Sequence, residues 1–181
     1  MAGTRYSLNW TATRSQYLCS QTVVIILPSS KTPPMITIGQ GYYDHQYYVR
    51  VTLESQENRA IQQDTINWWA TQPEGQKEAF MEEGRVPLDQ ALSSLYKLVW
   101  KCNRVWMNGP TYDANILEHA YKSYNMALPW QFYKIRDTRT IYSLWPELPK
   151  PPTSHHALED CRRQIDMLQA TLKHLNVKEI R

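Results

Sequence analysis

The segment from Arg104 to Asn125 constrains the fold most, because it predicts a β-strand, a turn and a helix in direct succession. The strand is expected at "RVWM", the turn at "NGPTYD" and the helix at "ANILEHAYKSYN". A strand that is followed by a turn and a helix is the unit from which parallel sheets are built, since parallel neighbours need a long crossover connection. The chain is therefore predicted to be an α/β protein.

Other segments add strands to the first half and helices to the second. Apolar residues fill consecutive positions from Val23 to Leu27, as in a strand covered on both faces, and "MITIGQGYY" and "QYYVRVTL" are two further strand candidates. Apolar residues at steps of three and four predict an amphipathic helix with one face formed by Leu88, Ala91, Leu92, Leu95 and Val99. The last helix is expected to carry a longer apolar stripe, made of Leu158, Cys161, Ile165, Leu168, Leu172 and Leu175.

Length and composition favour a single folded domain over residues 1–181, because a chain of 181 residues can bury one substantial core. No apolar run approaches the roughly 20 residues of a membrane-spanning helix, so we expect no membrane partner and a cytoplasmic location. The formal charge of +3 is compatible with a nucleic-acid partner but does not require one. The distribution of acids is more informative: none occurs from Met1 through Tyr43, and the first is Asp44.

Two acids stand where carboxylates can meet at one site. Asp113 follows the predicted strand at the start of a helix, where it can reach over the sheet edge. In the stretch "SHHALEDC", Asp160 comes five residues after His155, so a loop histidine and a carboxylate near a helix start can face the same point. Taken alone, Asp160 is more typical of a helix-surface acid that interacts with the helix dipole than of a metal ligand.

Five segments, in order, resemble the DEDDh (DnaQ-like) family of 3′-to-5′ exonucleases and, within it, the small phage-type exodeoxyribonuclease branch. They are "VRVTLESQ", "DTINWW", "MNGPTYDANIL", "PWQFYKIRDTRT" and "HHALEDCRRQ". The resemblance implies an RNase H-like fold, with a mixed five-stranded sheet flanked by helices. It also implies Mg²⁺ or Mn²⁺ held by four carboxylates, and a histidine that acts as general base toward water. Carried over to this chain, Asp113 and Asp160 would be metal ligands and His155 the base.

The first acidic motif of that family, Asp-x-Glu on the first strand, is missing. If "SLNWTAT" ends the first strand, Asn9 and Thr11 occupy the two positions; if "VVIILPSS" does, Ile26 and Pro28 occupy them. We favour the first placement, and both remain open. In either case two anions are absent, and neutral side chains offset less of the metal charge than carboxylates do. The metal chemistry is therefore expected to be impaired or lost, and a chain that binds no metal cofactor is the alternative.

Two functional hypotheses follow from these features. The first is an exonuclease-like protein that acts on or binds 3′ ends of single-stranded DNA or RNA, located in the host cytoplasm if a phage encodes it. The second is a catalytically inactive nuclease fold that is retained to bind a host protein or nucleic-acid ends. Trp68 is a candidate for base stacking, and Arg136 and Arg162 are candidates for phosphate contacts. A core position for Trp68 and a solvated basic face for the arginines are the competing interpretations.

Overall fold

The computed structural model describes residues 22–27, 45–52, 54–56, 67, 71, 83–100, 102, 104–152 and 157–177. This part of the chain is mixed α/β, with two pairs of strands, four α-helices and two short 3₁₀ helices. The predicted fold class is confirmed at this level. The five-stranded RNase H-like sheet stays a prediction, because the described strands form two separate pairs and the segment "MITIGQGYY" lies outside the described residues.

The first pair of strands is antiparallel. β1 (Thr22–Leu27) pairs with β2 (His45–Arg50), so that Thr22 lies opposite Arg50 and Leu27 opposite His45. Both strands lie where the sequence predicted them, and each begins one residue before the predicted segment. The chain then passes through the fully buried Val51, which makes a parallel bridge with Val86, and through the 3₁₀ helix η2 (Glu54–Gln56).

The helix α2 (Leu88–Val99) forms where the sequence predicted it, and all five residues of its predicted apolar face are buried. Two tyrosines tie this helix to its neighbours. The hydroxyl of Tyr121 donates to the carbonyl oxygen of Leu92 at 2.9 Å, and that of Tyr47 donates to the carbonyl oxygen of Ala91 at 3.1 Å. These bonds satisfy hydroxyls that packing removes from water, so the rings add apolar contact without leaving a donor unpaired.

The second pair of strands is parallel. β3 (Val105–Met107) pairs with β4 (Ile135–Asp137), with Met107 opposite Asp137. The crossover contains α3 (Pro110–Ser123) and the 3₁₀ helix η4 (Phe132–Lys134), and α4 (Thr138–Tyr142) follows β4 directly. This is the parallel unit that the strand, turn and helix pattern predicted.

The predicted start of α3 was wrong by four residues, because the helix begins at Pro110 and not at Ala114. Proline suits the first helical position, where its fixed φ is already helical and its missing N–H would have no partner inside the helix. Gly109 just before it has a φ of 98°, a left-handed conformation that favours glycine. Asp113 consequently lies within the helix and not in the preceding turn.

The helix α5 (Ala157–His174) packs against α4 and β1. Of its predicted stripe, Leu168 and Leu172 are buried, whereas Leu158, Cys161, Ile165 and Leu175 are only partly buried. The other buried residues of this helix are Met167 and Thr171, so its inner face is concentrated in its second half.

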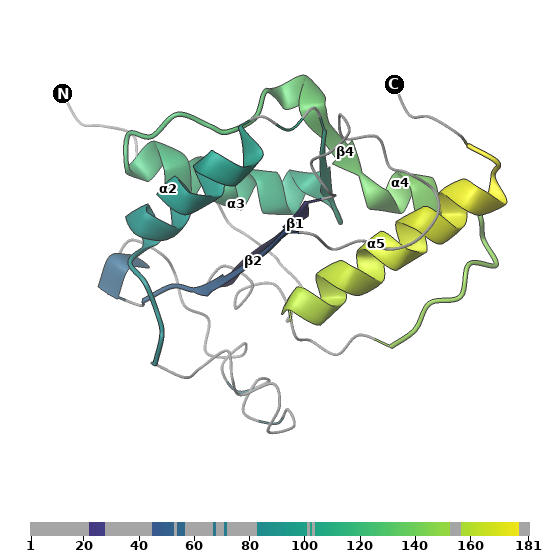
Figure 1. The fold of residues 1–181 in the computed structure, drawn as a ribbon, viewed down its shortest axis with the longest axis horizontal. Coiled ribbons are helices and arrows are strands. Elements are labelled where there is room, and N and C mark those ends of the chain that lie inside the picture. The colour runs from purple at the N-terminus through teal and green to yellow at the C-terminus, as the bar shows by residue number, and fades with distance from the viewer. Residues whose placement is uncertain are drawn as a thin grey trace.

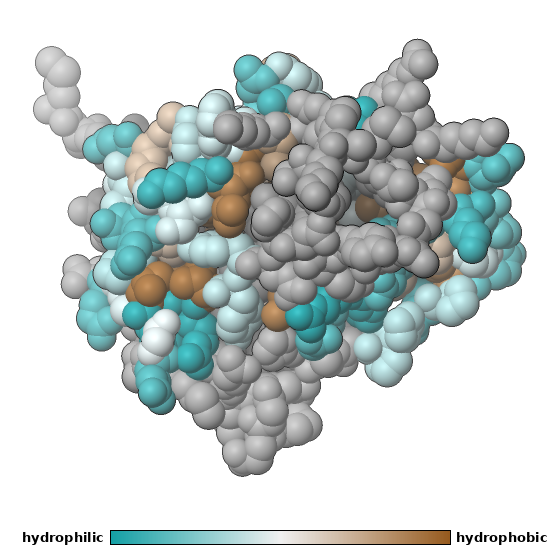
Figure 2. Space-filling model, viewed as in Figure 1, coloured by the Kyte–Doolittle hydropathy of each residue, from teal (hydrophilic) through white to brown (hydrophobic). Residues whose placement is uncertain are grey.

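The helices are arranged around the parallel pair of strands. In Figure 1, α2 and α3 lie on the left and α4 and α5 on the right, with β3 and β4 between them. Figure 2 shows hydrophilic residues over most of the described surface on the same face. None of the helices in the described ranges has the length and apolar character needed to cross a membrane.

Candidate functional site

The carboxyl ends of β3 and β4 define one edge of the parallel sheet. Met107 and Asp137 are neighbours in the register there, and the chain enters a helix just after each of them. In open α/β sheets, side chains from loops and helix starts gather at this edge and form ligand sites. The residues that follow the two strands are therefore the candidates for a functional site.

Asp137 connects the two chain segments at this edge through hydrogen bonds. Its Oδ1 accepts hydrogen bonds from the backbone N–H of Arg139 at 3.0 Å and of Gly109 at 3.3 Å, and its Oδ2 accepts one from the hydroxyl of Thr140 at 3.0 Å. The first of these bonds caps the N-terminus of α4. The bond to Gly109 fixes the turn after β3 to the start of α4. This supports the interpretation of Asp137 as a structural cap.

A second group of contacts places an arginine over the turn. Arg139 donates from Nε to Oδ1 of Asn108 at 3.3 Å, and the hydroxyl of Thr138 is 3.2 Å from the same oxygen. A Cβ atom at Gly109 would lie 3.4 Å from Cζ of Arg139. That distance is ordinary van der Waals contact, so it is the left-handed backbone conformation at this position that favours glycine.

Asp113 lies in the first turn of α3, close to this arginine. Burial raises the pKa of its carboxyl group to about 6, and the positive charge of Arg139 opposes part of that rise. The raised pKa means that desolvation outweighs the favourable charge. A carboxyl group with a perturbed pKa at a strand edge is a candidate for function on physical grounds.

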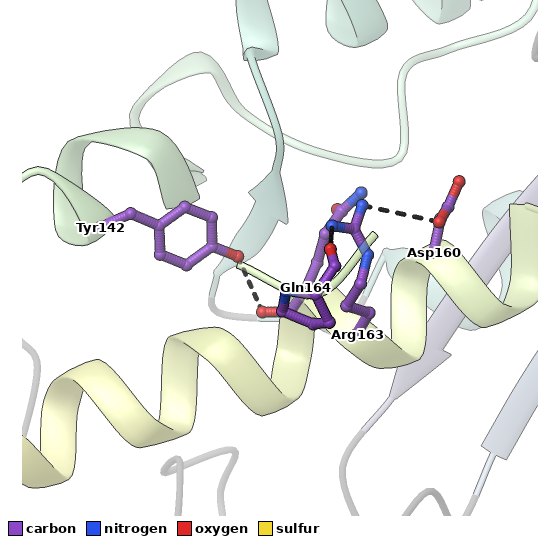
Figure 3. A network of polar contacts seen from close by, with 5 residues as sticks. Tyr142, Asp160, Arg163 and Gln164 are labelled. Atoms are coloured by element: carbon purple, nitrogen blue, oxygen red, sulfur yellow. Dashed lines mark hydrogen bonds and ion pairs between the residues drawn. The ribbon is translucent and has the colours of Figure 1, made fainter. Parts of the chain in front are cut away.

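Asp160 lies in the first turn of α5 and is partly buried. Its Oδ1 is 3.5 Å from Nη2 of Arg163, whose Nη1 donates to the carbonyl oxygen of Pro151 at 3.1 Å. Figure 3 shows Tyr142 of α4 reaching across to the same helix, where its hydroxyl donates to the carbonyl oxygen of Gln164 at 2.7 Å. These contacts hold the first half of α5 against the backbone at Pro151 and against α4.

The two predicted phosphate-binding arginines have different surroundings. Arg136 is in β4 and donates from Nη1 to the carbonyl oxygens of Tyr133 at 2.6 Å and Ile135 at 2.9 Å. Arg162 forms an ion pair with Glu159 at 2.5 Å, within one turn of α5. Arg136 therefore braces the backbone that leads into β4, while the charge of Arg162 is shared with a neighbouring carboxylate.

Four predicted site residues lie outside the described residues: Asn9, Thr11, Trp68 and His155. Their roles stay predictions, as does the alternative placement of the first motif at Ile26 and Pro28. Sequence reasoning did not single out Asn108, which positions Arg139. The Asn-Gly pair that follows the predicted strand was an available signal for a tight turn at this place.

The described carboxylate groups are of the type that binds divalent metal ions, but too few of them come together to hold one. Asp113 and Asp160 offer the hard oxygen atoms that Mg²⁺ and Mn²⁺ prefer, and a desolvated carboxylate such as Asp113 gains from a nearby cation. However, no group of three or more His, Cys, Asp or Glu side chains that could hold a metal ion comes together within the described ranges.

A partly buried carboxyl group at the carboxyl edge of parallel strands stands where open α/β sheets commonly form ligand sites. The family model described as the 3′-5′ exoribonuclease Rv2179c-like domain matches residues 28–172. The match spans most of the chain, so the protein belongs to this family. No curated protein and no solved structure matches the chain.

The family match confirms that the chain is related to 3′-5′ exonucleases. Asp113, His155 and Asp160 all fall within the matched segment, whereas Asn9 and Thr11 precede its first residue.

Proposed function

We propose that the protein is an exonuclease-like protein of the DEDDh type, which acts on or binds 3′ ends of single-stranded nucleic acid and whose hydrolytic activity is impaired. One observation carries the proposal: Asp113 lies at the carboxyl edge of β3 and β4, inside the segment that matches an exoribonuclease family, with its pKa raised by burial. We place the protein nearest to the phage-type branch, and in the cytoplasm of the host if a phage encodes it.

Both RNA and DNA are candidate substrates. The description of the matched family names an exoribonuclease, which favours RNA. The sequence segments resemble an exodeoxyribonuclease branch, which favours DNA. The contacts that a protein makes with the 2′-hydroxyl group decide between the two, so both are included in the test below.

In this proposal Asp113 and Asp160 would hold the metal ions and His155 would accept the proton of the attacking water. Divalent cations, when bound, activate the water and offset the charge that develops on the phosphate. Asp113 must lose its proton before it can act as a ligand, and its pKa of about 6 means that it does so above that pH. The guanidinium group of Arg139 acts electrostatically on Asp113 and is suited to phosphate oxygens.

The impairment follows from missing negative charge. No Asp or Glu precedes Asp44, so the first strand supplies no carboxylate in either placement of the first motif. Each candidate ligand that is described also has an arginine of the chain itself beside it, Arg139 near Asp113 and Arg163 near Asp160. The same two observations favour the second candidate function, an inactive nuclease fold kept to bind a host protein or nucleic-acid ends.

The test is digestion of 5′-labelled single-stranded RNA and DNA with Mn²⁺, comparing the native chain with Asp113→Ala. An exposed carboxylate on α2 offers the matched control, Asp89→Ala. We expect slow shortening from the 3′ end that Asp113→Ala abolishes and Asp89→Ala preserves. Rapid shortening by the native chain would refute the impairment. Binding of 3′ ends without any shortening would support the inactive fold, and neither binding nor shortening would refute both.

Restoring the first motif distinguishes its two placements. We expect Asn9→Asp combined with Thr11→Glu to increase the rate of shortening, because the pair returns two metal-binding carboxylates. The matched pair Ile26→Asp with Pro28→Glu should have no such effect. The opposite result, with both variants folded, would show that the first motif lies at the end of β1.

A further inference from the structure

Two adjacent aromatic rings project into solvent from η4. Phe132 is 85% exposed and Tyr133 is 57% exposed. Their ring centroids are 5.5 Å apart and their planes meet at 85°. Single exposed apolar side chains are common on protein surfaces, whereas two neighbouring large rings exposed to water form an apolar patch of the kind found at binding sites. In Figure 1 they belong to the short coil at the top of the view, directly before β4.

The backbone that carries these rings is fixed at both ends. Upstream, Trp130 is buried and packs edge to face against Tyr121, with ring centroids 6.2 Å apart. Downstream, Arg136 donates to the carbonyl oxygens of Tyr133 and Ile135. The hydroxyl of Tyr133 also donates to the side-chain oxygen of Gln131. The rings are thus held by specific contacts, which lowers the entropy that a ligand would lose on stacking against them.

The charge around the rings is positive. Lys134 and Arg136 follow them directly, and no Asp or Glu occurs between Glu118 and Asp137. Arg104 comes just before Val105, which lies opposite Ile135 in the parallel register, so its backbone is beside that of Lys134. Aromatic rings interleaved with basic side chains match a ligand with flat faces and negative charge. A single-stranded nucleic acid has both properties.

We infer that Phe132 and Tyr133 form a stacking platform for bases of a single strand whose 3′ end lies at the Asp113 edge. This inference rests on the proposed function. β4 is three residues long, so at about 3.3 Å per residue the platform is about 10 Å from the carboxyl edge. Single-strand binding sites take roughly 4 to 16 nucleotides, so a short oligonucleotide can reach both places.

The inference is tested by fluorescence anisotropy with labelled single-stranded RNA and DNA of two and ten nucleotides, in EDTA so that no strand is cleaved. Stacking on one aromatic ring typically strengthens binding by about 5- to 150-fold. We therefore expect Phe132→Ala with Tyr133→Ala to weaken binding of the ten-nucleotide strand at least about tenfold and to leave the dinucleotide unaffected. Tyr133→Phe, which keeps the ring, should retain the native affinity.

Leu144→Ala is the control, because this side chain is also 57% exposed but lies in the turn after α4. It should leave the affinity unchanged. Equal affinity of the double variant and the native chain for the longer strand would overturn the platform and leave the proposed function intact. Absence of any binding of the ten-nucleotide strand by the native chain would overturn the platform, and the digestion with Mn²⁺ described above would then decide on the proposed function separately. A double variant that keeps its strand affinity but loses self-association in sedimentation would instead assign the rings to a protein contact, and would also overturn the inference.

Discussion

Replacing Asp113 by Asn should stabilise the folded protein at neutral pH. The unfolded chain releases the Asp113 proton near its ordinary pKa of 3.8, whereas burial holds the folded-state pKa at about 6 despite the opposing charge of Arg139. Between these values the folded state binds more protons than the unfolded state, so the free energy of unfolding falls as the pH rises. The contribution of the protonated carboxyl group is complete below pH 3.8 and lost above about pH 6. Asn carries no charge to desolvate and avoids this loss.

The size of the effect follows from the shift. About two pKa units at 1.36 kcal/mol each correspond to about 3 kcal/mol between pH 4 and pH 7. That is a large share of the 5 to 15 kcal/mol that typically separates folded and unfolded states, on the order of a fifth to a half. An amide in place of a carboxyl group also changes local hydrogen bonds, but that difference is constant with pH. The slope, rather than the value at a single pH, therefore reports the desolvation of Asp113.

Urea unfolding of the native chain and of Asp113→Asn at each pH from 4 to 8 measures this slope. The difference in free energy should grow in favour of the variant up to about pH 6 and stay level above it. The matched control is Asp89→Asn, on the exposed side of α2, for which the difference should stay within about 0.5 kcal/mol across the range. A difference for Asp113→Asn that is flat, or that shrinks as the pH rises, would refute the account of a desolvated carboxylate.

Two further substitutions test the contacts that hold the site. Asp137→Ala removes the cap of α4 and the bond to Gly109, and should lower the free energy of unfolding by about 1 to 2 kcal/mol; a loss under about 0.3 kcal/mol in urea unfolding would contradict the capping role. Tyr142→Phe removes the hydroxyl that joins α4 to Gln164 and should cost about 0.5 to 1.5 kcal/mol. Its melting temperature in calorimetry should fall by a few degrees, and an unchanged value would mean that the bond contributes nothing.

The helices could be predicted from sequence because their signal is local. The apolar steps from Leu88 to Val99 coincide with α2 at both ends, and the strand β3 lies inside the predicted segment "RVWM". The start of α3 was missed because Gly109 and Pro110 are typical of turns as well as of helix starts, and only the backbone conformation distinguishes the two. In α5 the apolar stripe predicted which side of the helix faces the interior of the protein. It did not predict that the buried residues lie in the second half of the helix.

The site could be predicted only in part. Asp113 was identified from its place between a strand and a helix, but its raised pKa depends on burial by segments that are distant along the chain. The position of Arg139 over Gly109 requires the parallel register of β3 and β4, which sequence alone did not fix. Phe132 and Tyr133 were missed because adjacent aromatic residues predict a buried strand as readily as an exposed pair.

If Asp113 and Asp160 form one metal site, as proposed, the chain itself already offsets their charge, and metal binding would then depend on the nucleic acid. Asp113 and Asp160 carry two negative charges, and Arg139 and Arg163 bring two positive ones. At an effective dielectric constant of about 20, two unit charges 4 Å apart interact by about 4 kcal/mol. A divalent cation that approaches these carboxylates is attracted by them and repelled by the arginines, so its net attraction is small without further anions. The phosphates of a bound 3′ end supply those anions. We therefore expect metal and strand to bind the proposed site together more tightly than either binds alone.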